Sequence, residues 1–460
     1  MREHMQSAAD STVFSGLRNG SVGFFGSLFQ SLSGMGLLLD VGAIFIPVFA
    51  IAGRFAPLSI LLGFFFSLLL VNTTYVFSQR YSSSGGYIKF ISSVFGRNAG
   101  KAFGWLYCAY TFAVLPNIAI FLGMLYAPPL IGLTFPGVHV SAVDTFGIMA
   151  LIILVVTAVV LLGIKPTARF VIIAGIAELT VLVSLSATVW HQTGYALEAS
   201  PFMPGASSIG AVGAGALYAL LMFAGSGSPV MLGEEIANPS RNIGRSIVLS
   251  VTAAGLLLLF TAYVFDTRLG TGVGSLSGSY LPSIASSAGP LFEAFVSVFV
   301  ITSSVALAVS FLTGFSRGIY FMSKNRLMMH RSLGRLDLSR RVPYIAVLIA
   351  SFLSFVTASV TSYLFGPYTA FLLLITTVTV GFATIHTAVN IALIASGGVT
   401  RSLLRHVALP LLSSATLISI LVLTLLPGTW TILVPVTFMG ILAASVMTIS
   451  RLSHGTAQAE

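Results

Sequence analysis

The chain has 460 residues, of which 56% are hydrophobic and only 7% are charged, and its mean hydropathy is +0.99. This composition excludes an ordinary soluble domain, in which about a quarter of the residues are charged. The net charge of +10 does not indicate a nucleic-acid-binding protein, because the basic residues lie in short loops between apolar segments rather than in one patch. The sequence therefore predicts an all-α membrane protein.

Apolar runs of about 20 residues recur along the chain, and each is long enough to cross a hydrocarbon core of about 30 Å. Residues 1–20 lack the apolar centre and the cleavage site of a secretory signal, so we expect a cytoplasmic tail ahead of an uncleaved first span. We predict twelve transmembrane helices, at residues 21–52, 57–78, 103–126, 143–164, 169–190, 210–233, 244–265, 288–322, 343–364, 367–396, 407–426 and 431–450.

The basic residues support both the number of spans and their orientation. If the N-terminus is cytoplasmic, every Lys and Arg except Arg54 and Arg268 falls on the cytoplasmic side or at its boundary. This asymmetry is the positive-inside rule, and one missed span would place the later basic loops on the wrong side. We therefore expect a multi-pass protein of the cell membrane with both termini in the cytoplasm. The single cysteine, Cys108, lies within the third span, which excludes an intrachain disulfide.

Glycine and serine residues interrupt two of the predicted spans. The first span contains SLSGMGLLLDVGAIF, with Gly34 and Gly36, and the sixth contains MFAGSGSPVML, with Gly225 and Gly227. Backbone groups freed inside a bilayer need partners, so irregular backbone at that depth is buried in protein or lines a cavity. Broken helices of this kind indicate the central site of a secondary transporter.

The positions of the two breaks also predict how the chain is organised. Spans one and six are five helices apart, and an odd number of crossings places equivalent halves in opposite orientations. We therefore expect two inverted five-helix repeats, with the site between them near the membrane midplane. The predicted domains are a cytoplasmic tail, the first repeat, the second repeat, helices 11 and 12, and a cytoplasmic tail, at residues 1–20, 21–190, 191–396, 397–453 and 454–460.

Three segments between the spans carry a resemblance to a known family. SSSGGYIKFISSVFGRNAGKAFGW at residues 82–105 resembles that family's loop into span three, with its paired glycine, aromatic residue and later Gly-Trp. GEEIANPSRNIGRSI follows span six, and FSRGIYFMSKNRLMMHRSLGRLDLSRRVPYIAVL follows span eight. In this order they resemble the amino acid–polyamine–organocation (APC) transporter superfamily over nearly the whole chain. The resemblance implies a LeuT-like fold of ten core helices in two inverted repeats, followed by two further helices.

The resemblance also implies a substrate-binding site at the two breaks. Half-helix N-termini attract anions and C-termini attract cations, so the freed backbone is expected to hold the polar head of a substrate. The alternative is that the glycines only allow close helix packing. Family members usually have an aromatic residue after the glycine that corresponds to Gly225, and Ser226 at this position predicts a pocket that is more open or more polar than usual. The predicted substrate-binding residues are Gly34, Met35, Gly36, Asp40, Phe223, Ala224, Gly225, Ser226 and Gly227.

Asp40 is the predicted site residue that most restricts the class of substrate. A charged group deep in a membrane is costly, by about 2.5 to 3.5 kcal/mol on insertion scales, and is usually functional. A carboxylate facing the site would attract an ammonium group or a metal cation and repel a substrate's own carboxylate. It therefore favours an amine, a polyamine or a basic amino acid. The alternative is that Asp40 is protonated, or caps the local break.

Glu178 lies in the middle of the fifth span, where it cannot reach either membrane surface. In some proton-coupled relatives this position, nine residues after an arginine equivalent to Arg169, holds a lysine, so a lysine-based mechanism does not transfer to this chain. A carboxyl group suits a proton carrier or a cation ligand; alternatively, it is permanently protonated and bonded to a neighbouring helix. Thr302, Ser303 and Ser304 offer hydroxyl ligands for sodium, or alternatively partners for the backbone. We predict H⁺ as the coupling ion, with Na⁺ as the alternative.

Other polar and aromatic residues receive structural interpretations. His386 is expected to be a hydrogen-bonded core histidine, and Tyr110, like Phe223, either gates the pocket or packs. Glu234, Glu235 and Arg241 follow span six and are predicted to form a cytoplasmic salt-bridge gate or brace.

These features predict a secondary active transporter that moves an amino acid or organic amine, with cationic substrates favoured. The alternative within the same fold is a transporter of an inorganic cation such as K⁺. An intramembrane enzyme is not predicted, because the sequence has no H-E-x-x-H motif. A primary pump is not predicted either, because the sequence has no phosphate-binding loop. A partner subunit with an inactive core is a third possibility. We expect no cofactor, no resident metal and no nucleic acid, and the predicted partners are a small-molecule substrate and the lipid bilayer.

Overall fold

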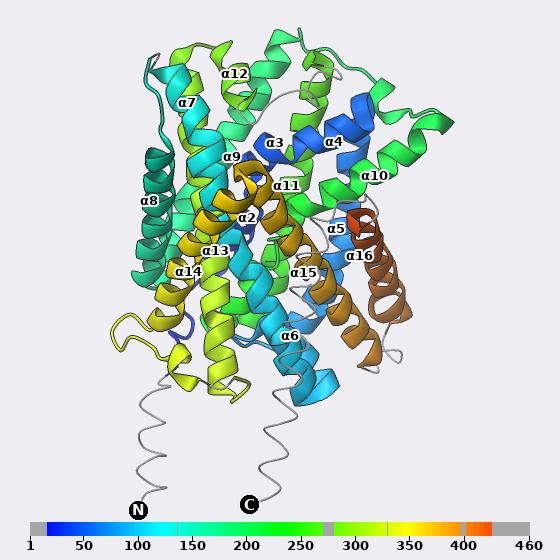
Figure 1. The fold of residues 1–460 in the computed structure, drawn as a ribbon. Helices are drawn as coiled ribbons and strands as arrows, with labels where there is room; N and C mark the ends of the chain where they lie inside the picture. The colour runs from blue at the N-terminus through cyan, green and yellow to red at the C-terminus, as the bar shows by residue number, and fades with distance from the viewer. Residues whose placement is uncertain (1–15, 136, 270–279, 329, 397–401, 426–460) are drawn as a thin grey trace, which may run out of the picture.

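The computed structural model describes residues 16–135, 137–269, 280–328, 330–396 and 402–425 (Figure 1). Within these residues the chain is helical apart from turns, short loops and one isolated β-bridge between Val22 and Ile236. Eleven helical segments in this part of the chain are long and apolar enough to cross a membrane. The all-α membrane protein predicted from the sequence is thereby confirmed. The span predicted at residues 431–450 lies outside the described residues.

Most predicted spans correspond to single helices, and the predicted ends agree with the observed ends to within five residues. Two shorter helices, α7 (Ala127–Thr134) and α12 (Tyr280–Ser286), join spans. The spanning helices are α5 (Ala56–Ser78), α8 (Ala142–Leu161), α9 (Ile164–Gln192), α11 (Pro239–Leu269), α13 (Pro290–Lys324), α14 (Tyr344–Phe365), α15 (Pro367–Ala395) and α16 (Leu409–Leu425).

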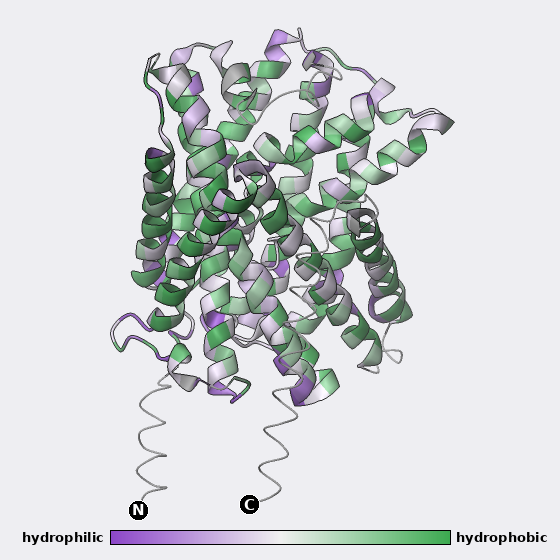
Figure 2. Ribbon diagram, in the orientation of Figure 1, coloured by the Kyte–Doolittle hydropathy of each residue, from purple (hydrophilic) through white to green (hydrophobic). Residues whose placement is uncertain are grey.

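The outer helices present apolar side chains to their surroundings. α8 and α16 lie at opposite edges of the bundle in Figure 1, and α14 crosses its front. Figure 2 shows α8 and α16 as mainly hydrophobic along their length. Leu154, Phe352 and Leu412 on these helices are each more than half exposed. An apolar surface of this extent suits contact with lipid, since soluble monomers rarely expose such large patches.

The third span begins earlier than the sequence predicted. We expected a loop at residues 82–102 and a helix from residue 103, whereas α6 (Gly86–Ile120) is helical from Gly86 and continues as a π-helical turn (Phe121–Tyr126). Its first part carries basic residues such as Lys89 and bends at Gly96, where φ is 82°. Counting apolar residues finds only the part of a helix that lies deep in the membrane, so this polar, basic first part was missed.

Both predicted helix breaks are present. The first span is divided into α2 (Phe24–Met35), α3 (Leu37–Ala43) and α4 (Phe45–Ala52). Gly36 separates α2 from α3 with φ 71° and ψ 62°, a left-handed conformation that glycine adopts without steric cost.

The sixth span is interrupted in a similar way. α10 (Ile209–Leu220) continues into a 3₁₀ turn, η5 (Leu221–Phe223), then an irregular turn, and then a second 3₁₀ segment, η6 (Ser228–Leu232). The relation between the two halves as inverted repeats stays a prediction.

The two broken helices meet at one end, and α2 and α3 of the first one are almost entirely buried. α2 packs against α9, α11 and α13, and α3 packs against α9 and α13. Just before α2, the Val22 amide donates to the Glu235 carbonyl (2.9 Å), and the Ala237 amide donates to the Val22 carbonyl (2.8 Å). The chain that enters α2 is therefore hydrogen-bonded to the chain that leaves η6.

Candidate functional site

The two helix breaks touch each other through their backbones. A Cβ atom added to Gly225 would lie 1.6 Å from the Gly34 carbonyl oxygen, so neither side of this contact tolerates a side chain. Ser31 Oγ donates to the Ser226 carbonyl (2.6 Å), and Ser228 Oγ donates to the Gln30 carbonyl (2.7 Å). The close-packing role that the sequence left open therefore applies to Gly34 and Gly225, although both glycines also line the adjacent cavity.

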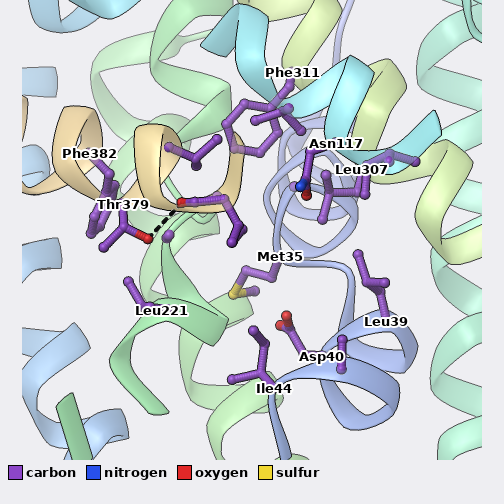
Figure 3. Close-up of a pocket in the computed structure, with 18 of the residues that line it drawn as sticks. Met35, Leu39, Asp40, Ile44, Asn117, Leu221, Leu307, Phe311, Thr379 and Phe382 are labelled. Atoms are coloured by element: carbon purple, nitrogen blue, oxygen red, sulfur yellow. Dashed lines mark hydrogen bonds between the residues drawn. The ribbon is translucent and has the colours of Figure 1, made fainter. Parts of the chain in front are cut away.

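A cavity lies beside this contact. Its lining comes from α2, α3, η5, α6, α13 and α15 (Figure 3). Among the described lining residues, only Asp40, Asn117 and Thr379 have nitrogen or oxygen in their side chains. The other lining side chains are hydrocarbon, aromatic or methionine, so the cavity is apolar with one ionisable group.

Asp40 stands in the first turn of α3 and directs its carboxyl group into the cavity near Met35 and Ile44 (Figure 3). Its side chain is only 6% exposed, and its Oδ2 atom accepts no hydrogen bond within the protein. A buried carboxylate oxygen without a partner is unfavourable, so a positive charge or a hydrogen-bond donor placed beside it would be stabilising.

Glu178 does not line this cavity but lies behind α3, on α9. Its Oε1 atom accepts a hydrogen bond from the Leu38 amide (2.9 Å) and another from Ser303 Oγ. The residue before α3 is Gly36, which has no side chain to cap the helix, so Glu178 takes that role from 140 residues away in sequence. The bond to a neighbouring helix that the sequence left open as an alternative is therefore present.

The remaining predicted coupling residues have different surroundings. Ser303 reaches Glu178, whereas Thr302 Oγ1 donates to the Val298 carbonyl (3.0 Å) and Ser304 Oγ donates to the Val300 carbonyl (2.8 Å) of their own helix. The structure thus brings Glu178 together with one of the three hydroxyl groups.

The predicted residues of span six divide between two locations. Ala224 and Gly225 line the main cavity, together with Gly34, Met35 and Asp40 from the first span. Gly36 lies outside that lining, and Leu307 packs against it. Phe223 is buried against Phe64, with ring centroids 6.1 Å apart. Ser226 and Gly227 line a small neighbouring cavity with Tyr87 and His386.

Sequence reasoning missed several lining residues. Asn117 is a buried amide in an apolar span, which is a signal that could have been noticed, and its Nδ2 donates to the Phe371 carbonyl (2.8 Å). Thr379 donates to the Ile375 carbonyl of its own helix (2.9 Å; Figure 3). Phe311 and the other apolar lining residues have no such signal, because apolar residues fill every span.

The sequence predicted that Glu234 and Glu235 form a salt-bridge cluster with Arg241, and the choice of Arg241 as the basic partner is wrong. Glu235 pairs with Arg317 of α13, with Nε–Oε2 at 3.0 Å and Nη2–Oε1 at 3.1 Å, and both side chains are no more than 1% exposed. Glu234 pairs with Lys324 at 3.7 Å. Arg241, the partner expected from the sequence, is exposed in the first turn of α11. Its nearness to the glutamates in sequence is not nearness in space.

Substituting Gly225 with alanine is expected to destabilise the protein by about 1 to 3 kcal/mol, because the new methyl group collides with backbone that cannot move aside. Gly213→Ala on α10 is the matched control, since a Cβ atom there meets nothing within 4 Å. The temperature at which each purified variant loses its folded monomer measures the effect. Equal temperatures for the two variants would contradict the close backbone contact.

The comparison with known proteins agrees with this architecture. The amino acid permease family model matches residues 26–452, which include both helix breaks and the cavity. No curated protein matches the sequence. Together with the apolar helices, the family match establishes a multi-pass membrane transporter rather than an enzyme. The chain belongs to the amino acid permease family.

Proposed function

We propose that this protein is a secondary active transporter that carries an amino acid or organic amine, with cationic substrates favoured, across the cell membrane. The observation that carries the proposal is the buried Asp40 carboxyl group, whose Oδ2 atom has no hydrogen-bond partner in a cavity beside both helix breaks. An ammonium group bound there gains a charge-assisted hydrogen bond, which is among the stronger polar interactions in proteins.

Alternating access requires that the cavity open to one side at a time. The pairing of Val22 with Glu235 and the buried Glu235–Arg317 ion pair hold the ends of α2, η6 and α13 together. The predicted orientation places this contact on the cytoplasmic side. Movement of the broken helices away from α13 would separate these groups and open the inner path, and its reversal would close it.

Glu178 is the proposed carrier or sensor of a coupling proton. Its carboxylate caps α3, the half-helix that also bears Asp40. Protonation would remove the negative charge from this helix end and weaken the bonds from Leu38 and Ser303. The charge state of Glu178 would thereby bias the position of α3. Sodium is the alternative coupling ion, with the hydroxyl group of Ser303 beside Glu178 as one available ligand.

The cavity lining favours an organic substrate over K⁺, the alternative drawn from the sequence. A potassium site replaces the hydration shell of the ion with several oxygen atoms. The described lining offers few side-chain oxygen atoms and many hydrocarbon groups, which suit the carbon skeleton of an amine or amino acid.

Uptake into proteoliposomes tests this function. Vesicles with an alkaline interior are expected to accumulate a labelled amine or amino acid above the level of protein-free vesicles, and a protonophore is expected to abolish the excess. If accumulation requires a sodium gradient instead, the coupling ion is Na⁺ rather than H⁺. Flux of K⁺ without uptake of any organic substrate would overturn the proposal.

Substituting Glu178 with glutamine is expected to leave substrate binding within about threefold, while uptake no longer responds to the pH gradient. Glutamine has the same shape and can still accept the Leu38 hydrogen bond, but it cannot exchange a proton. Glu293→Gln, which changes another glutamate in a membrane helix away from the cavity, is the control and should keep the gradient response. If uptake by Glu178→Gln still follows the gradient, another group carries the proton.

A further inference from the structure

We propose that a second cavity binds the ammonium group of the substrate after it leaves Asp40 and before it reaches the cytoplasm. This inference rests on the proposed function, in which Asp40 holds that group in the main cavity. The second cavity, or inner cavity, is lined by α6, α13, α15 and the turn of span six. The side chains that line it with rings or polar groups include Tyr87, Tyr107, Tyr110, Ser310, Phe311 and His386.

The inner cavity continues the main cavity along the same face of α6. Asn117 and Val114 line the main cavity, and Tyr110 and Tyr107 line the inner one. Residues three or four apart share one face of a helix, so these four residues form a single stripe. In the predicted orientation α6 starts at the cytoplasmic side, so the two tyrosines lie closer to the cytoplasm than Asn117 does.

The other two helices place the inner cavity on the same side. On α15, Phe382 lines the main cavity (Figure 3), and His386, one turn later, lines the inner one. On α13, Phe311 lines both cavities, Gly314 lines the inner one, and Arg317 of the buried ion pair follows on the next turn. Both helices run toward the cytoplasm in the predicted orientation. The inner cavity therefore lies between the main cavity and the ion pair that is proposed to close the inner path.

Buried polar groups of the inner cavity lack partners. Tyr87 Oη and Ser310 Oγ have no hydrogen-bond partner, although these residues are only 3% and 0% exposed. The His386 ring, expected from the sequence to be hydrogen-bonded, makes no hydrogen bond within the described part of the chain. It packs against Tyr87 and Phe382, with ring centroids 4.8 and 4.4 Å away. Buried groups of this kind are unfavourable when unpaired, so a polar ligand beside them would be stabilised.

The rings of the inner cavity favour a cation as that ligand. The Tyr107 ring centroid lies 6.3 Å from that of Tyr87 and 5.3 Å from that of Tyr110. The face of an aromatic ring carries partial negative charge and attracts an ammonium group within about 6 Å. None of the described lining residues is Lys or Arg, so no permanent positive charge opposes the cation. Hydroxyl oxygen atoms and a neutral imidazole can accept its hydrogen bonds.

The composition of the inner cavity suits a passing substrate rather than a resting one. None of its described lining residues is Asp or Glu, so it should hold an ammonium group less tightly than Asp40 does. A site on a permeation path must bind well enough to be entered and weakly enough to be left. Ala224, Gly225 and Phe311 line both cavities, so the hydrocarbon body can stay in the main cavity while the ammonium group enters the inner one.

Methylammonium chloride is the probe for the inner cavity, because it carries the ammonium group without a hydrocarbon body to anchor it in the main cavity. Binding is measured by the thermal shift of the full-length protein in detergent, relative to equal sodium chloride. Asp40→Asn is the background, so that the main cavity carries no charge. Methylammonium is expected to stabilise Asp40→Asn, and to stabilise it equally when Tyr107→Phe is added, since that substitution keeps the ring.

Adding Tyr107→Leu to the same background is expected to weaken methylammonium binding by at least about fivefold, because a ring face is lost. Tyr363→Leu is the matched control, since Tyr363 is 84% exposed on α14 and lines neither cavity. Tyr110→Leu removes another ring of the inner cavity and replaces Tyr107→Leu if that variant yields no folded monomer.

The effect on transport is measured with Asp40 intact. Tyr107→Leu is expected to lower the rate of amine uptake at saturating substrate by at least about tenfold, while amine affinity changes by less than about threefold. Tyr107→Phe and Tyr363→Leu should transport the amine at nearly the rate of the unaltered protein.

The outcomes separate this inference from the proposed function. If methylammonium does not stabilise Asp40→Asn, or if Tyr107→Leu and Tyr363→Leu have equal effects, the inference fails, and uptake of an amine by the unaltered protein would still support the proposed function. Stabilisation by sodium acetate instead of methylammonium would make the inner cavity an anion site and overturn the inference. If methylammonium binds as expected but no amine or amino acid is taken up, the proposed function fails, and the transit role fails with it.

Discussion

Substituting Arg317 with alanine is expected to destabilise the folded protein by about 3 to 5 kcal/mol, because the Glu235 carboxylate would be left buried without its partner. Both side chains of this pair are almost fully buried, and two hydrogen bonds join them. The loss of the pair also releases the chain at Glu235, whose carbonyl accepts the Val22 amide. The fraction of folded monomer that remains after heating in detergent measures the loss.

Lys324→Ala is the matched control for Arg317→Ala. Lys324 lies on the same helix and pairs with Glu234, but their side chains are 41% and 24% exposed. Exposed ion pairs contribute about 0 to 1 kcal/mol, so this variant should behave nearly as the unaltered protein does. The double variant Arg317→Met, Glu235→Gln should recover part of the stability, since it leaves no unpaired buried charge. Equal losses of stability from Arg317→Ala and Lys324→Ala would contradict the structural role of the buried pair.

The substitution Asp40→Asn is expected to weaken binding of an amine substrate by about thirtyfold or more, and to abolish its uptake. Removing one partner of a buried charge pair costs about 2 to 5 kcal/mol, and each 1.4 kcal/mol corresponds to a factor of ten. Asparagine fills nearly the same space, so the cavity and the fold should persist. Thermal shift with an amine panel and proteoliposome uptake provide the two measurements.

Asp144→Asn is the control for Asp40→Asn. Asp144 is exposed in the first turn of α8, where it takes part in a capping box with Ser141, and it lies outside the cavity lining. Its substitution should leave amine affinity unchanged. An unchanged affinity in Asp40→Asn would remove Asp40 from the substrate site, and stabilisation of both variants by neutral amino acids would point to a different recognition group.

Features that depend on local composition were predictable from the sequence. The length of each apolar run gives the approximate ends of most spans, since a helix that crosses the membrane must be apolar over about 20 residues. Gly36 and the Gly225 region indicate the breaks because glycine weakens a helix wherever it stands. Loop motifs that follow one another in order indicate the family, which the match over residues 26–452 confirms.

Pairings between distant segments were decided only by the tertiary structure. The Leu38 amide meets Glu178 across 140 residues, and Arg317 meets Glu235 across 82 residues. The sequence contains all of these residues but does not show which of them pair. For Glu235 it suggested Arg241, which is near only in the chain. Whether Glu178 faces the cavity or caps α3 depends on how α9 packs against α3.

Asp40 and Asn117 show the same difference between what local composition predicts and what only the tertiary structure decides. A carboxyl group in an apolar span is so unfavourable that its presence alone indicates a role, and the sequence therefore singled out Asp40. Asn117, Phe311 and Leu307 join it in the cavity only because α6 and α13 pack beside the broken helices. Local hydrophobicity and glycine content determine which segments span and where they break, whereas the contacts made by packed helices determine which side chains form the site.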